Sequence, residues 1–335
     1  MLHRPSPRTI AVAIAGTAAI ALMGCSPGSG SSSATSTPAG AAPTGAQLAT
    51  VVNCGRELSV STPPSRVLIG YPTIWKTLDA LGVGDSVAGY LTGGLTDLPA
   101  GADPSIQEVS SEYHVPRETL LTFGPDLTIF SSESQVTGEN GDATVADLAA
   151  AGIPAFMMQG NCLDTALQTD DQIDTVYSDI EALGILYDRQ AEAASLADQL
   201  KERVRQAATL RGDAPRPRTA FIQVFDGTVY ALGLGNYAAV IDAIGAENHF
   251  ADILGDLAYV EISMETALSI DADHLVVVHY NDQTPDQAVE AIRSLLPNVK
   301  PVEEGHVIAV HTDNFQVGGV PLIDVTVEIA EAIYR

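Results

Sequence analysis

Aromatic and histidine side chains stand next to the ends of apolar segments that are typical of buried strands. Only 5% of the residues are aromatic, so their recurrence at these positions is informative. Tyrosine and tryptophan combine a broad apolar surface with a polar group, which suits the binding of an organic ligand. Each could instead pack within its loop, and Trp75 could face the core of the first helix. The candidate ligand-binding residues are Tyr71, Trp75, Tyr90, Tyr113, Ser131, Tyr230, Tyr237, Tyr259, His279, Tyr280 and His311, with Phe225 and Asn236 in the same loops.

Motifs that carry catalysis are missing from this sequence. It has no Gly-x-Ser-x-Gly, His-Glu-x-x-His or Walker motif. Gly233-Leu-Gly235-Asn-Tyr-Ala238 resembles a dinucleotide fingerprint, but no acidic residue ends a strand about 20 residues later, as that fingerprint requires. We interpret it as a turn at the rim of a site. The seven histidines include no pair at helical ligand spacing, so neither an enzyme nor a receptor that binds a metal ion directly is expected.

Two segments of the chain repeat one pattern of residue types. Residues 118–126 and 265–273 both begin with Glu-Thr, carry Leu at the fourth place and end in Asp, and an apolar strand follows each. A helix ahead of each repeat ends at a glycine, Gly82 or Gly245, which suits a left-handed C-cap. The strands ahead of those helices cover residues 66–70 and 219–224. The chain therefore contains two similar α/β units with continuous apolar strands, typical of parallel sheets covered on both faces.

The segment between the two units is helical in pattern. Apolar residues from Ile173 to Leu183 recur at helical spacing, Gly184 interrupts them, and a second stripe runs from Ala193 to Ala207. We expect an α/β fold of two lobes, each a small mainly parallel sheet flanked by helices, joined by one long rigid helix. The carboxyl ends of both sheets should face a common cleft. The expected ranges are 51–185 for the N-terminal lobe, 186–211 for the linking helix and 212–335 for the C-terminal lobe.

The first residues resemble a secretion signal. Arg4 and Arg8 precede an apolar run over residues 10–22, which is shorter than the roughly 20 residues of a membrane span. The following Leu-Met-Gly-Cys resembles a bacterial lipobox, which implies cleavage before Cys25 and attachment of lipid, palmitate included, to its sulfur. An ordinary signal with a chance cysteine is the alternative. Residues 1–24 are thus the expected signal peptide. Residues 25–50 are rich in Ser, Gly, Thr, Ala and Pro and are expected to form a flexible tether. The protein would be anchored at the extracytoplasmic face of the cell membrane.

The remaining chain is strongly acidic. Residues 1–24 contain two Arg and no acidic residue, so their removal takes the formal net charge from −26 to −28. Such a surface repels nucleic acid and anionic lipid and makes a highly anionic ligand a poor match, although solubility alone is an alternative explanation. Of the three cysteines, Cys54 and Cys162 remain as an even pair in an oxidising compartment, which predicts a disulfide within the first lobe.

Several motifs, in their order along the chain, resemble one family. They are Asn53-Cys-Gly55, Pro64-Ser-Arg-Val67, Leu78-Asp-Ala-Leu-Gly82, Glu112-Tyr113, Arg117-Glu-Thr-Leu-Leu121, Pro125-Asp126 and Asn161-Cys162. Together they resemble the helical-backbone class of periplasmic-type solute-binding proteins, which serve iron–siderophore, haem and cobalamin importers. Asn161-Cys162 resembles the actinobacterial siderophore branch in particular. The resemblance spans residues 51–335 and implies a monomeric receptor for an ABC importer permease, without a cofactor of its own.

The resemblance also implies roles for two glutamates. Glu118 and Glu265 match the family's one glutamate per lobe that grips arginines of the permease. Both are also first-turn acids, which the helix dipole favours by about 0.3–1 kcal/mol, and the two roles are compatible. The second repeat departs from the family pattern, because it carries Ala272-Asp273 where Pro-Asp is expected.

The resemblance and the residues together favour one ligand class. Lys76 and Arg117 are the only cations near the candidate loops, so a ferric hydroxamate fits better than a highly anionic ferric catecholate. Haem, with axial ligands from histidine or tyrosine, is an alternative, as are cobalamin and a non-transport surface sensor or adhesin. The candidate haem ligands are His114, His279, His311, Tyr259 and Tyr280.

Overall fold

The computed structural model describes residues 49–93, 96–158, 161–167, 172–255, 257–280 and 283–335. The expected signal peptide, the lipidation site Cys25 and nearly all of the expected tether lie outside the described residues. Strand β1 (Ala49–Asn53) begins just ahead of the boundary expected at residue 51. Within the described ranges, no helix has the length and apolarity needed to cross a membrane.

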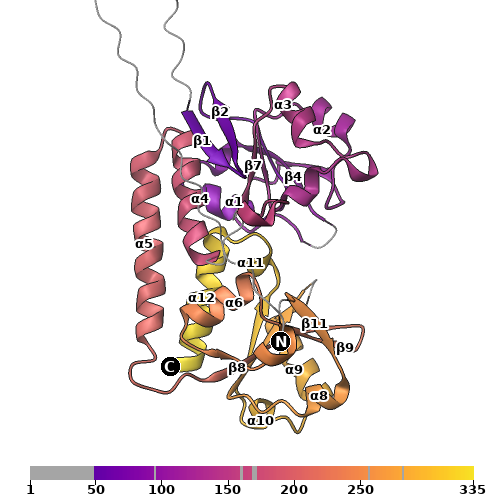
Figure 1. Ribbon diagram of the computed structural model, residues 1–335, viewed down its shortest axis with the longest axis vertical. Helices are drawn as coiled ribbons and strands as arrows, with labels where there is room; N and C mark the ends of the chain where they lie inside the picture. The colour runs from indigo at the N-terminus through magenta and orange to yellow at the C-terminus, as the bar shows by residue number, and fades with distance from the viewer. Residues whose placement is uncertain (1–48, 94–95, 159–160, 168–171, 256, 281–282) are drawn as a thin grey trace, which may run out of the picture. The chain divides into compact units, whose positions relative to one another are not determined.

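The N-terminal lobe is built on a five-stranded sheet whose strands all run parallel (Figure 1). In sheet order the strands are β5 (Gln107–Ser110), β4 (Val87–Leu91), β3 (Val67–Ile69), β6 (Leu127–Phe130) and β7 (Ala155–Met157). The central strands β3 and β6 are buried along their whole length, as expected for a sheet covered on both faces. The flanking elements are an antiparallel hairpin of β1 with β2 (Arg56–Val60) and helices α1 (Ile74–Ala80), α2 (Arg117–Phe123) and α3 (Val145–Ala150). Short 3-10 helices cover Gly84–Ser86, Glu133–Val136, Glu139–Gly141 and Thr165–Leu167.

The C-terminal lobe has a mixed sheet. In sheet order its strands are β11 (Tyr259–Ile262), β9 (Thr228–Leu232), β8 (Arg218–Phe225), β12 (His274–His279) and β13 (Val307–His311), with β10 (Glu247–Asn248) also beside β8. Strands β8, β10, β12 and β13 pair in parallel, whereas β9 and β11 pair antiparallel with their neighbours. The reversal follows from Asp226-Gly227, whose positive φ angles of 48° and 78° suit the two-residue turn of a hairpin. Its helices are α6 (Asn236–Ala243), α7 (Ala251–Leu254), α8 (Met264–Leu268), α9 (Pro285–Leu295), α10 (Lys300–Glu303), α11 (Asp313–Gln316) and α12 (Gly319–Tyr334).

The repeated segments adopt the same local structure. In both, the final aspartate precedes a strand, β6 or β12, and its carboxylate binds the backbone at the start of a neighbouring strand, β3 or β8. The Asp126 carboxylate accepts hydrogen bonds from the backbone N–H of Ser65 (2.8 Å) and Arg66 (2.9 Å), and the Asp273 carboxylate accepts one from Arg218 (2.9 Å). The hydrogen bond from Arg218 lowers the pKa of Asp273. The duplication inferred from residue types is therefore present in the structure.

Two helices connect the lobes, α4 (Gln172–Leu186) and α5 (Gln190–Thr209), and α5 packs against α4 and α12 (Figure 1). The expected interruption at Gly184 is wrong, because α4 continues through that residue. A Cβ atom on Gly184 would lie 2.3 Å from the Cβ of Ala193. Glycine is therefore needed here for the close approach of α4 and α5, and it does not end the helix.

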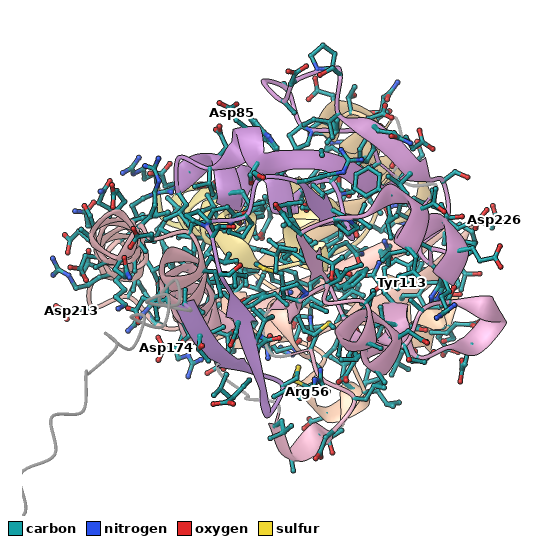
Figure 2. All side chains as sticks on the ribbon, turned by 90° about the horizontal axis from the view of Figure 1, so that it is seen from above. Arg56, Asp85, Tyr113, Asp174, Asp213 and Asp226 are labelled. Atoms are coloured by element: carbon teal, nitrogen blue, oxygen red, sulfur yellow. A yellow bond between two sulfur atoms is a disulfide. The ribbon has the colours of Figure 1, made fainter. Side chains whose placement is uncertain are left out.

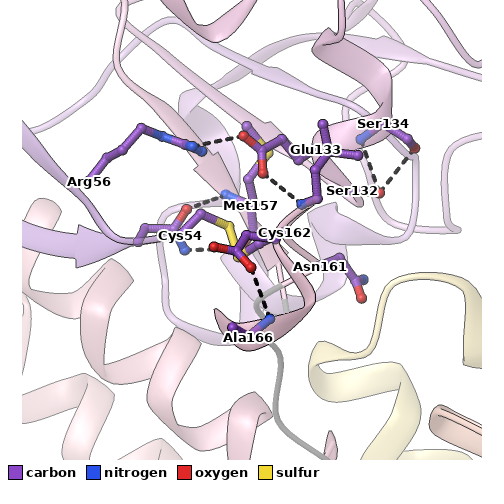
Figure 3. The surroundings of a disulfide bond; sticks show 12 residues. Cys54, Arg56, Ser132, Glu133, Ser134, Met157, Asn161, Cys162 and Ala166 are labelled. Carbon is purple, nitrogen blue, oxygen red and sulfur yellow. Dashed lines mark hydrogen bonds and ion pairs between the residues drawn. A yellow bond between two sulfur atoms is a disulfide. The ribbon is translucent and has the colours of Figure 1, made fainter.

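The disulfide between Cys54 and Cys162 is present, as predicted, within the N-terminal lobe (Figure 3). Beside it, the Asn53 side chain donates to the carbonyl of Met157 (2.9 Å) and accepts from its N–H (2.7 Å). The Asn53 amide thus pairs with the backbone of the last residue of edge strand β7. Glu133 accepts from Arg56 (2.7 Å) nearby. These contacts fasten the hairpin of β1 and β2 to edge strand β7 of the five-stranded sheet.

Candidate functional site

The carboxyl ends of the two sheets meet where the lobes join. Tyr71, which follows β3, donates a hydrogen bond of 2.8 Å from its hydroxyl to Oδ1 of Asp313, which follows β13. A second contact joins the lobes where the N–H of Val320 donates to Oγ1 of Thr77 (3.1 Å). The parallel strands of both lobes therefore direct their carboxyl ends toward one junction, as the sequence predicts.

Asp313 is the centre of a polar cluster at this junction. Thr96 of the N-terminal lobe donates to Oδ2 of Asp313, and Nδ1 of His311 lies 3.2 Å from the same oxygen. Burial by itself would raise the pKa of Asp313, but the hydrogen bonds from His311, Thr96 and Tyr71 outweigh it and hold that pKa below its usual value. Asp313 is thus a carboxylate shared by both lobes. Asp313 was not among the residues predicted from the sequence, although it lies only two residues beyond His311, the last residue of β13.

Three of the candidate residues are engaged in packing. Tyr71 is 2% exposed, and burial, reinforced by the charge of Asp313, raises its pKa, so its hydroxyl stays protonated as a donor. Trp75 is 8% exposed and belongs to the main core, which is the alternative that the sequence left open. Tyr237 stacks on Phe315 with ring centroids 4.7 Å apart, and burial raises its pKa to about 12.

The N-terminal side of the junction is organised by Gln135, which is fully buried. Its amide oxygen accepts from the N–H (2.9 Å) and hydroxyl (2.8 Å) of Ser131, and its amide nitrogen donates to the carbonyls of Gly70 (2.9 Å) and Tyr113 (2.7 Å). The Tyr113 hydroxyl in turn lies 3.0 Å from that of Ser131. This network holds the half-buried Tyr113 ring in one orientation. No local signal in the sequence distinguishes Gln135 from a surface glutamine.

Tyr90 lies in β4 and is half-buried. Burial, followed by the charges of Glu108 and Asp97, raises its pKa. Acidic groups therefore surround this tyrosine on the N-terminal side.

Two histidines lie side by side at the ends of β12 and β13. His279 and His311 are paired in the register of these strands, and their ring centroids are 5.1 Å apart. His279 is 5% exposed, and neither of its ring nitrogens has a hydrogen-bond partner among the residues that the structure describes. Its pKa is lowered by burial and by the charge of His311. It lines a cavity of about 80 Å³ against α9, among Val224 and Ile292. His279 is thus a buried neutral histidine.

The remaining C-terminal candidates form what we call the aromatic row, which consists of Phe225, Tyr280, Tyr230 and Tyr259. The rings of Phe225 and Tyr280 are 5.7 Å apart, and those of Tyr230 and Tyr259 are 6.0 Å apart. Burial, then the charge of Asp226, raises the pKa of Tyr280. Tyr230 is the register partner of Gln223 in β8, two residues before Phe225. Phe225 and Tyr259 are 52% and 65% exposed. The structure thus brings together four aromatic side chains from three strands and a loop.

Three of the remaining charged candidates lie on the first turns of helices, and His114 precedes α2. Glu118 and Glu265 are exposed at equivalent places of α2 and α8. Arg117 pairs with Asp147 (3.0 Å), and His114 lies 3.0 Å from a carboxylate oxygen of Asp142, a pair that is ionic only when the histidine is protonated.

The glycines of the fingerprint-like segment have a structural explanation. Gly233 follows β9, and a Cβ atom there would lie 2.1 Å from the Asn248 side chain. Gly235 has a φ of 59° and precedes α6. Packing and turn geometry thus account for both glycines, as the interpretation of this segment as a turn anticipates.

Comparison with known proteins agrees with this architecture. A family model described as periplasmic binding protein matches residues 67–313. The petrobactin-binding protein YclQ of Bacillus subtilis is 20% identical, with a TM-score of 0.69, over 86% of this chain and 99% of that one. An ABC-type Fe3+-hydroxamate transport system from Saccharomonospora viridis is 24% identical, with a TM-score of 0.65, over 85% and 99% of the two chains. The haem-binding protein HutB of Vibrio cholerae is 15% identical, with a TM-score of 0.64, over 81% and 99%. At these identities the likeness shows the fold. Curated proteins give no match.

Proposed function

Because this chain belongs to the periplasmic binding protein family, we propose that it is the lipid-anchored, extracytoplasmic receptor of an ABC importer and carries a ferric siderophore of the hydroxamate type. The family and the structural neighbours are solute-binding transport proteins, and the chain is a binding protein rather than an enzyme. The specific ligand, the lipid anchor and the monomeric state are parts of the proposal.

The observation that carries the ligand class is the charge of the loops at the carboxyl ends of the strands. Residues 77–116 and 219–292 contain no Lys or Arg at all. Of the two cations near the site, Arg117 is paired with Asp147. A highly anionic ferric catecholate would find no positive side chains there to balance its charge. A ferric hydroxamate has no large negative charge and needs no such side chains. The aromatic row and Tyr113 supply the apolar area and hydroxyl groups that an organic chelate needs.

The test is a calorimetric titration of the protein with a ferric trihydroxamate, a ferric tricatecholate and haem, carried out side by side. Calorimetry is preferable to Trp75 fluorescence, because Trp75 is buried in the core. Saturable binding of the hydroxamate alone supports the proposal. Tighter binding of the catecholate refutes the hydroxamate assignment. Tighter binding of haem favours the haem alternative, for which the half-buried His311 at the end of β13 is a candidate ligand.

We further propose that Glu118 and Glu265 contact arginines of the permease. Each lies exposed on the first turn of its helix, and the duplication places them equivalently in the two lobes. The double substitution Glu118→Gln and Glu265→Gln should abolish import while ligand affinity stays unchanged. The control is the double substitution Glu57→Gln and Glu303→Gln. It makes the same change in net charge at two exposed glutamates elsewhere. Equal import by both double variants would contradict the docking role.

A further inference from the structure

The aromatic row lies on one face of the C-terminal sheet. Tyr230 is the register partner of Gln223 on β8 and of Glu261 on β11, so these three side chains share a face. Phe225 is two residues beyond Gln223 and Tyr259 is two residues before Glu261, so side-chain alternation puts them on that same face. The face therefore presents aromatic rings together with the carboxylate of Glu261.

The row is accessible, which is unusual for side chains of this size. Phe225 is 52% exposed, Tyr259 is 65% exposed, and Tyr230 and Tyr280 are half-buried. Exposed apolar groups gathered in one place, rather than scattered singly, commonly mark a binding surface. Phe225 and Tyr280 lie at the carboxyl ends of β8 and β12, at the edge of the sheet that is directed toward the lobe junction. Tyr230 and Tyr259 continue the row across β9 and β11, away from that edge.

The charged side chains nearest to the row are negative. Glu261 lies on its face and Asp226 is exposed on the adjoining turn, where it acts on Tyr280. In the view of Figure 2, Asp226 projects from the periphery of the molecule, on the same side as Tyr113. The stretch 219–292 supplies no Lys or Arg. Arg218, the nearest cation in sequence, is at the opposite end of β8, where it donates to the carbonyl of Asp271 (3.1 Å).

From this combination we propose that the aromatic row binds a positively charged group of the ligand, so that the ferric chelate proposed above is a cationic one. This inference rests on the proposed function. A cation over an aromatic face gains about 0.5–1 kcal/mol at an exposed site and about 2 kcal/mol when desolvated. Carboxylates beside the rings add an attraction that salt screens. A neutral chelate gains neither, and an anionic one is repelled by Asp226 and Glu261.

The experiment uses three ferric trihydroxamates that share one iron centre and differ at one remote group. Ferrioxamine B carries a free ammonium, its N-acetyl derivative is neutral, and its N-succinyl derivative carries a carboxylate. Calorimetric titration into the protein at low salt should give an affinity for the ammonium form about tenfold above the neutral form, and weakest binding of the carboxylate form. The preference should shrink as salt is added.

Variants separate the row from the overall acidity of the protein. Asp226→Asn with Glu261→Gln should remove most of the preference for the ammonium form and leave affinity for the neutral form within about twofold. Asp213→Asn with Glu303→Gln makes the same change in net charge at exposed positions outside the row and should leave the preference intact. Tyr259→Leu, an exposed position whose loss does not open the core, should weaken the ammonium form more than the neutral form.

The outcomes distinguish this inference from the function on which it rests. Equal affinity for the three chelates overturns the inference and leaves the hydroxamate receptor standing. An equal loss of preference in both double variants also overturns it, because the preference would then come from net charge and not from the row. Binding of none of the three refutes the hydroxamate assignment and the inference with it.

Discussion

Removal of the Tyr71 hydroxyl should weaken the junction between the lobes more than the loss of an ordinary tyrosine hydroxyl. In Tyr71→Phe, the Asp313 carboxylate loses a 2.8 Å hydrogen bond from a side chain that is 2% exposed. Hydrogen bonds to charged groups contribute about 1.5–3 kcal/mol, against about 0.5–1.5 kcal/mol for neutral pairs. Because Thr96 and His311 still contact Asp313, we expect a loss of about 2 kcal/mol, or roughly 3 °C in Tm for a chain of this size.

The matched control is Tyr187→Phe. Tyr187 is also buried, but its hydroxyl lies 2.9 Å from that of Ser86, a neutral partner. Urea unfolding of both variants, with Asp313→Asn to complete a double-mutant cycle, measures the coupling between Tyr71 and Asp313. A loss in Tyr71→Phe no greater than in Tyr187→Phe would refute the reasoning.

The pH dependence of the same variant provides a second check. Asp313 has a folded-state pKa below its ordinary value of 3.8. Its contribution to stability is therefore present above that value and lost as the pH falls through the folded-state pKa. The difference in unfolding free energy between wild type and Tyr71→Phe should accordingly shrink in strong acid, and a constant difference would show that the carboxylate is not the acceptor that matters.

Three further predictions concern packing, protonation and covalent structure. Gly184→Ala should destabilise the protein by about 1–3 kcal/mol, because the new methyl would overlap Ala193; an unchanged urea midpoint would contradict this. His279 is held neutral, with a pKa below its ordinary value of 6.5, so the stability of the protein should fall as the pH drops below that value. His279→Asn should reduce this fall. Equal pH profiles of stability for the two proteins would exclude His279 as its cause. Replacing Cys54 and Cys162 by Ala opens a loop of 108 residues and should cost about 4–5 kcal/mol by the chain-entropy model, measured against the oxidised protein; a loss below 1 kcal/mol would contradict it.

Much of the fold was predictable because its signals are local. The repeated Glu-Thr segments, the glycines that end the helices and the apolar strands all follow from backbone preferences within a few residues. The disulfide was predictable for a different reason, since only two cysteines remain once Cys25 is set aside. The hairpin after β8 was missed, although Asp226-Gly227 is a strong turn signal, because the apolar strand pattern alone favoured a parallel arrangement.

The tertiary structure decided what the candidate residues do. Tyr71 and Asp313 are 242 residues apart in the chain, and no local pattern can show that two strand ends from different lobes will meet. The faces of Tyr230 and Tyr259 depend on strand register, because a shift of one residue would turn each side chain to the opposite face. The sequence by itself therefore determined which elements form and which residue types follow them. Packing between distant elements determined which of those side chains are buried at the junction and which remain exposed to meet a ligand.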